Sequence, residues 1–113
     1  MTSPKRINPV KPSAAFPIAQ MPLTMHALGY LSCKGAIKYD VSPCEMREMA
    51  FDEFEEKALR HHNRSKVEII DADTLAPHIV AAAWNYNAYV QIMLKYDPAH
   101  VDWFKTTDFF TEE

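Results

Sequence analysis

The sequence predicts an all-α domain, a small bundle of three main helices, and three observations support this fold class. Apolar residues recur at intervals of three and four along three segments, as they do on the buried face of a helix. Each segment begins near a proline or a capping residue, which is typical of a helix start. The one strand-like run, residues 67–70, is too short to predict a strand.

Proline content and composition divide the 113 residues into an arm, a helical domain and a tail. Residues 1–22 hold five of the eight prolines, which fix φ and lack an N–H donor, so we expect an extended arm. Residues 23–96 hold the helical patterns. Residues 97–113 form an acidic tail whose large apolar side chains are Trp103, Phe104, Phe109 and Phe110. Such a cluster either covers the bundle or contacts a partner.

Local patterns set the expected helix boundaries. The first helix is expected over about residues 23–34. The second, residues 43–63, follows Ser42-Pro43-Cys44-Glu45, which has the pattern of a capping box with proline at the first helical position. The third runs to about residue 96 from a cap at Asp73 or Thr74.

Charge, cysteine content and hydropathy exclude several classes of protein. The net charge of −3 argues against general nucleic-acid binding, which depends on clustered Lys and Arg. No apolar run approaches the roughly 18 residues of a membrane span, and prolines interrupt the N-terminal region where a signal peptide would lie. Cys33 and Cys44 lack a CxxC spacing. We therefore expect reduced core thiols in a cytoplasmic protein.

A row of carboxylates lies on one face of the expected second helix. Its members, spaced i, i+3, i+7 and i+10, are Glu45, Glu48, Asp52 and Glu55. Aligned carboxylates bind hard cations such as Mg²⁺. An acidic row is more often a solvated helix face, and both interpretations stay open here.

A second group of polar side chains surrounds the expected junction of the second and third helices. It contains His61, Asp71 or Asp73, His78 and Asn85. Imidazole, carboxylate and amide groups together can bind a metal or a phosphate, or act as acid and base. The structural alternative is that Asp73 caps a helix, His61 is a hydrogen-bonded core histidine and Asn85 binds a buried carbonyl.

Two acidic pairs carry a first family resemblance. Glu45-x-x-Glu48 precedes Glu68-Ile69-Ile70-Asp71. This order resembles the ExxE…ExxD arrangement of MazG-like all-α nucleotide pyrophosphohydrolases, in which four carboxylates hold Mg²⁺ against a nucleoside triphosphate. That group has its second pair on a helix, whereas a connection is expected here.

Five short motifs between about residues 28 and 95 carry a second resemblance. They are Gly35-Ala36-Ile37-Lys38-Tyr39, Ala58-Leu59-Arg60-His61, Asp71-Ala72-Asp73-Thr74, Pro77-His78 and Ala82-Ala83-Trp84-Asn85. Their order resembles a family of small bacteriophage proteins known as dATP/dGTP diphosphohydrolase-like. That family often has a second histidine where this chain has Ala81.

The phage resemblance implies a nucleotide phosphohydrolase-like protein that cleaves or binds purine deoxynucleoside triphosphates, with Mg²⁺ as cofactor. The implied metal ligands are Glu45, Glu48, Asp52 and Asp71. The implied catalytic residues are His61, His78, Asp71 and Asp73. The implied ligand-binding residues are Arg60, Asn85, Lys38 and Tyr39.

Two other classes of function remain open at this stage. One is a non-enzymatic phage counter-defence protein, which would bind a nucleotide or a host protein in the host cytoplasm. The other is a structural or assembly subunit. In each case we expect a homo-oligomer, in which the arm or tail can contact a neighbouring copy.

Overall fold

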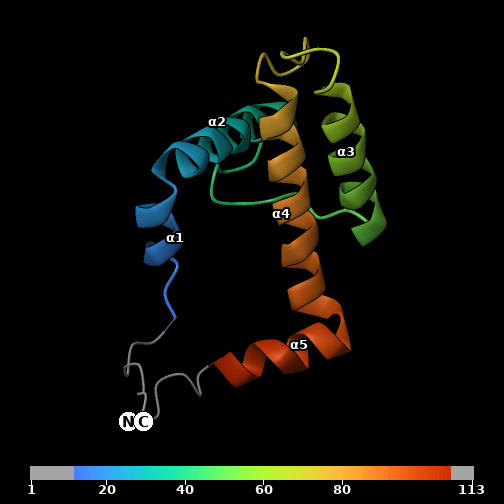
Figure 1. Ribbon diagram of the computed structural model, residues 1–113. Coiled ribbons are helices and arrows are strands. Elements are labelled where there is room, and N and C mark those ends of the chain that lie inside the picture. The colour runs from blue at the N-terminus through green and yellow to red at the C-terminus, as the bar shows by residue number, and fades with distance from the viewer. Residues whose placement is uncertain (1–11, 108–113) are drawn as a thin grey trace, which may run out of the picture.

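The computed structural model describes residues 12–107 and confirms the all-α fold class. Its helices are α1 (Ala15–Gln20), α2 (Pro22–Tyr39), α3 (Phe51–Arg64), α4 (His78–Tyr96) and α5 (Pro98–Lys105). α3 and α4 run side by side in opposite directions, α2 crosses the first half of α4, and α5 turns away from its end (Figure 1). The described residues contain one isolated bridge, between Ile70 and Pro77, and no strand. None of their helices is long and apolar enough to cross a membrane.

The described part of the Pro-rich arm is partly helical, so the expectation of an extended chain is wrong there. Pro17 lies in the first turn of α1 and Pro22 at the start of α2. In the first turn of a helix the backbone N–H has no intrahelical acceptor, so proline is tolerated. The Ser13 hydroxyl also accepts a hydrogen bond from Ala15 N at 3.1 Å. Residues 1–11 lie outside the described part.

The capping-box motif forms a turn but does not start a helix. Ser42 N donates to Glu45 Oε1 at 3.2 Å, as the motif predicts, yet α3 begins only at Phe51. The residues between run beside α4, where Met46 and Met49 pack against the core. Burial of these two side chains outweighs the local preference for a helix, because a cap contributes only about 1 kcal/mol.

The core consists of two apolar clusters joined by Trp84. One cluster centres on Leu31 and Ala81, and the other on Phe54 and Ile92. The Trp84 ring meets Phe54 edge-on, with 6.1 Å between centroids, and its Nε1 donates to Ser32 Oγ at 3.0 Å. Trp84 therefore ties α2 and α3 to α4.

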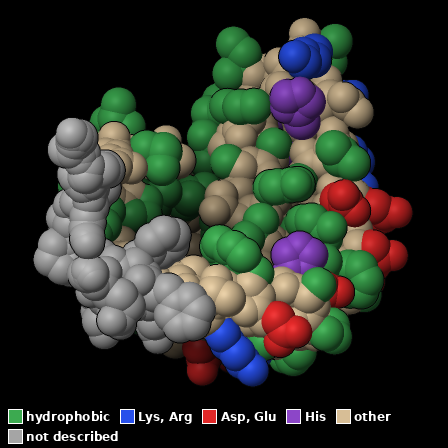
Figure 2. Space-filling model, turned by 60° about the horizontal axis from the view of Figure 1, so that its bottom comes forward, with side chains coloured by type: hydrophobic (Ala, Val, Ile, Leu, Met, Phe, Trp, Pro, Cys, Tyr) green, Lys and Arg blue, Asp and Glu red, His purple; other side chains and the backbone are tan. Residues whose placement is uncertain are grey.

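The described part of the tail forms α5, a helix that the sequence did not predict. Pro98 occupies its first turn, and the Asp97 side chain accepts a hydrogen bond from His100 N at 3.3 Å. Trp103 and Phe104 remain 58% and 53% exposed, so they do not cover the bundle. Figure 2 shows hydrophobic side chains on the surface at this end of the molecule. Phe109 and Phe110 lie outside the described residues.

Candidate functional site

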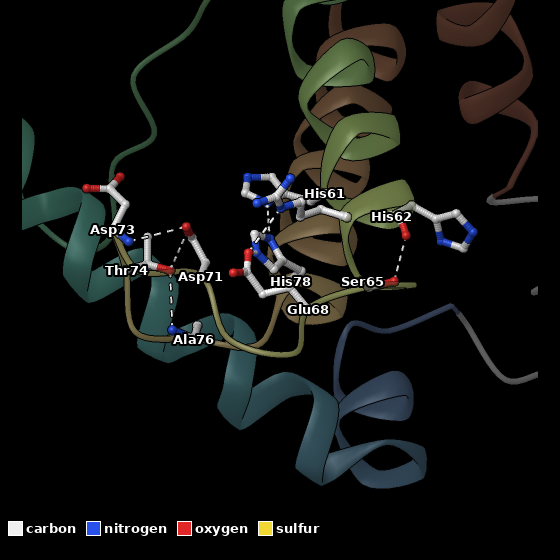
Figure 3. Close-up of polar contacts among 10 residues, drawn as sticks. His61, His62, Ser65, Glu68, Asp71, Asp73, Thr74, Ala76 and His78 are labelled. Atoms are coloured by element: carbon white, nitrogen blue, oxygen red, sulfur yellow. Dashed lines mark hydrogen bonds and ion pairs between the residues drawn. The ribbon is translucent and has the colours of Figure 1, made fainter.

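Two histidines meet where α3 ends and α4 begins (Figure 3). His61 Nδ1 lies 2.9 Å from His78 Nδ1, and the ring centroids are 5.2 Å apart. The antiparallel arrangement of α3 and α4 places the last turn of one beside the first turn of the other. The structure thus brings together the two histidines that the sequence analysis grouped.

Glu68 is the third member of this cluster. The chain makes one more turn after α3, in which Glu68 N donates to Arg64 O at 3.0 Å. That turn places Glu68 Oε1 3.0 Å from Arg64 Nε and 3.1 Å from His78 Nε2. From the sequence, Glu68 was assigned only to the MazG-like pattern. The i, i+4 spacing of Arg64 and Glu68 could have predicted the ion pair that holds the Glu68 side chain in place.

Asp71 organises the connection to α4. Its carboxylate accepts hydrogen bonds from Asp73 N at 3.2 Å and from the Thr74 hydroxyl at 3.0 Å. Partial burial raises the pKa of Asp71, but these hydrogen bonds and the nearby His61 hold it below its ordinary value overall. Asp71 is therefore an ionised loop-forming residue, as in an Asx turn.

Neither Asp73 nor Thr74 caps a helix, which corrects the expected start of the third helix. α4 begins at His78 after Pro77. Asp73 is exposed and lies 3.9 Å from Lys38 Nζ. Such an exposed ion pair contributes little to stability, at most about 1 kcal/mol.

The environment of His61 favours its neutral form. Burial lowers the pKa of His61, the Asp71 carboxylate raises it, and His78, Arg60 and Lys57 lower it. The result is a pKa below the ordinary value. A neutral imidazole has one ring nitrogen free to accept a proton.

The lowered pKa of His61 predicts a loss of stability on mild acidification. His61 binds a proton near pH 6.5 in the unfolded chain but only at lower pH in the folded chain. Proton binding by the unfolded chain therefore destabilises the fold below about pH 6.5. We expect the Tm to be flat above that pH and to fall as the pH drops through the folded pKa. Calorimetry from pH 8 to pH 5 on the wild type and His61→Gln tests this. An equal fall in both proteins would contradict it.

A groove of about 1260 Å³ lies beside His61, bounded by α2, α3, α4 and the segment between α2 and α3. Its basic lining residues are Lys34, Lys38, Arg47, Lys57, Arg60 and Lys95. Its acidic lining residues are Glu45, Glu48, Asp71 and Asp73. We call it the basic groove, because cations outnumber anions there although the whole chain is acidic.

The basic groove collects most of the residues that the sequence analysis selected. Lys38, Tyr39, Arg60 and Asn85 all line it, as does His61. Asn85 also donates to Ala81 O at 2.8 Å, as its structural interpretation predicted. The Arg47 guanidinium lies over the Tyr39 ring, 4.8 Å from its centroid. His78 is only 5% exposed and stays behind His61.

The four carboxylates implied as metal ligands do not converge, because the helix expected to align them starts later. Glu45 and Glu48 precede α3, and Asp52 lies in its first turn. Glu48 instead accepts hydrogen bonds from Lys95 Nζ at 2.6 Å and from the Tyr96 hydroxyl at 2.8 Å. These bonds hold the pKa of Glu48 below its ordinary value.

The length of α4 separates Glu48 from Asp71. Glu48 is bound at the end of α4, whereas Asp71 lies beside its beginning, and 17 residues of helix span about 25 Å. One ion cannot bridge that distance. Within residues 12–107 no three His, Cys, Asp or Glu side chains are grouped so as to hold a metal. The predicted metal set therefore does not fit this fold.

The site consists of a neutral histidine at the wall of the basic groove, with a buried histidine and a carboxylate behind it. This arrangement offers positive charge for an anionic ligand and a nitrogen that can accept a proton. No family model, curated protein or solved structure matches the chain.

Proposed function

We propose that this protein binds a purine deoxynucleoside triphosphate in the basic groove and is a nucleotide phosphohydrolase-like protein. The excess of cationic over anionic side chains along the groove that His61 lines, in a chain of net charge −3, is the observation that supports it. A triphosphate is a compact polyanion, and Lys and Arg side chains bind it through charge-assisted hydrogen bonds. The preference for a purine deoxynucleotide comes from the resemblance to the phage family.

Within this proposal, residues of the basic groove have separate roles. Lys57 and Arg60 offset phosphate charge. They precede and follow the buried Ala58 in the sequence of α3, and both line the groove. Asn85 and Tyr39 contact the sugar or the base. His61 accepts the proton of the attacking water. No step is assigned to a protein-bound Mg²⁺, because Glu45, Glu48, Asp52 and Asp71 do not converge.

Removing positive charge from the groove should weaken nucleotide binding. We expect Lys57→Gln/Arg60→Gln to reduce the affinity for dATP and dGTP by about a hundredfold or more, since each of the two charge-assisted bonds contributes roughly 1.5–3 kcal/mol. Isothermal titration calorimetry of the full chain, with and without Mg²⁺, measures this. The matched control is Lys66→Gln/Lys105→Gln, which removes the same charge from positions that do not line the groove.

The same titration separates the binding protein from the enzyme. ³¹P NMR of the mixtures detects a deoxynucleoside monophosphate and pyrophosphate if the protein hydrolyses the substrate. Tight binding without products would favour the counter-defence alternative, in which the protein sequesters the nucleotide. No binding of either nucleotide, or equal losses in both double variants, would contradict a nucleotide site in the groove.

A further inference from the structure

We propose that Glu68, His78 and His61 form a proton relay, in which Glu68 sets the tautomer of both imidazoles and His61 Nε2 becomes the proton acceptor at the groove. The chemical use of the relay rests on the proposed function, but its tautomers do not. Glu68 and His78 are positioning residues in this relay, and His61 is the candidate catalytic residue.

The relay is a continuous chain of hydrogen-bonding groups. Arg64 Nε contacts Glu68 Oε1 at 3.0 Å, and the same oxygen lies 3.1 Å from His78 Nε2. On the other side of the His78 ring, Nδ1 lies 2.9 Å from His61 Nδ1. Both distances to His78 are those of hydrogen bonds, so each contact holds one proton.

The charge on Glu68 decides where those protons are. Hydrogen bonds from Arg64 and then His78 hold the pKa of Glu68 below its ordinary value, so the group is an ionised carboxylate. A carboxylate only accepts hydrogen bonds, and therefore His78 Nε2 carries a proton. In a neutral His78 the Nδ1 atom is then an acceptor. The proton between the two rings must belong to His61 Nδ1.

Of the four ring nitrogens, His61 Nε2 is consequently the one whose lone pair is free to accept a proton. Among residues 12–107 this atom has no hydrogen-bond partner, and His61 is the histidine of the pair that lines the groove. Asp71 is less suited as a base. Its carboxylate is occupied by Asp73 N and the Thr74 hydroxyl.

The relay supplies a place for the charge that proton uptake creates. As a water oxygen attacks the α-phosphorus, its proton moves to His61 Nε2. The Nδ1 proton of His61 shifts to His78 Nδ1, so the positive charge comes to rest on His78 beside the Glu68 carboxylate. The bond between the α-phosphorus and the bridging oxygen breaks, and pyrophosphate leaves with the electron pair. The Glu68 carboxylate stabilises the positive charge on His78, and His61 stays neutral after it has taken up the proton. This stabilisation makes His61 a better general base.

¹⁵N imidazole NMR of the intact, unliganded protein tests the relay. At about pH 8, where ordinary histidines are neutral, we expect His61 as the Nδ1–H tautomer and His78 as the Nε2–H tautomer. Glu68→Leu removes the acceptor that fixes these tautomers, so we expect it to shift the His61 signals towards the Nε2–H form. Glu56→Leu, the same substitution at an exposed position of α3, should leave both tautomers unchanged.

Two outcomes would overturn the relay. One is a wild-type His61 in the Nε2–H form, a result that needs no variant to fold. The other is a folded Glu68→Leu protein whose two histidines keep their wild-type tautomers. Because neither measurement includes a nucleotide, a failed relay is distinguishable from a failed nucleotide site. Expected tautomers without nucleotide binding would contradict only the proposed function.

Discussion

Phe54→Ala should lower the free energy of unfolding by about 3–5 kcal/mol, the range for removing a buried aromatic ring. Phe54 is 2% exposed and is the one large side chain that is fully buried among the described residues. It contacts the ring of Trp84, which joins both apolar clusters. With alanines at many of the other buried positions, the neighbours have little bulk with which to fill the cavity.

Urea denaturation followed by circular dichroism measures this loss. The matched control is Phe51→Ala on the same helix, whose side chain is 54% exposed. Surface substitutions usually change stability by less than about 0.5 kcal/mol, so the control should unfold near the wild-type midpoint. Similar losses in the two variants would show that Phe54 is not the centre of the core.

His61→Gln should lower kcat for nucleotide hydrolysis by roughly 10²–10⁴-fold, the usual contribution of a general base. The cationic side chains that we propose bind phosphate are intact in this variant, so KM should change little. Steady-state release of pyrophosphate from dATP or dGTP measures both constants. His62→Gln is the matched control, because the neighbouring side chain is exposed and points away from His78 (Figure 3).

The pH profile gives a second readout for the same residue. Burial and the nearby Arg60 and Lys57 keep the pKa of His61 below its ordinary value, against the opposing effect of Asp71. The rate should therefore hold at neutral pH and decline only when His61 is protonated at lower pH. That decline should be absent from the residual activity of His61→Gln. Equal activity in His61→Gln and His62→Gln would remove His61 from the mechanism.

The fold class was predictable because helical periodicity is a local property. Each of the apolar stripes that bury Phe54, Ala58 and Ala88 spans only a few turns, so the sequence contains the whole pattern. The start of α3 was not predictable in the same way. The capping box at Ser42 is a valid local pattern, but the decision depends on Met46 and Met49 meeting α4.

The candidate site also has some features that were predictable from local sequence patterns and others that were not. His61 and His78 meet because a short connection joins the two helices that carry them, and this contact was predictable for that reason. The predicted metal ligands depended on one long helix that carries Glu45 and Glu48. These ligands do not converge, because that helix begins only at Phe51. Glu68 was missed because its position depends on the turn after α3.

The sequence by itself determined the all-α fold class, the apolar faces of the main helices, and that two histidines flank one helix junction. Only the tertiary structure decided that Glu68 lies behind His78, that Glu48 pairs with Lys95, and that cations outnumber anions in the groove that His61 lines. The physical reason is the separation in sequence between the interacting residues. Helix formation depends on residues three and four apart, whereas these contacts join side chains from separate segments that meet only after the apolar faces are buried.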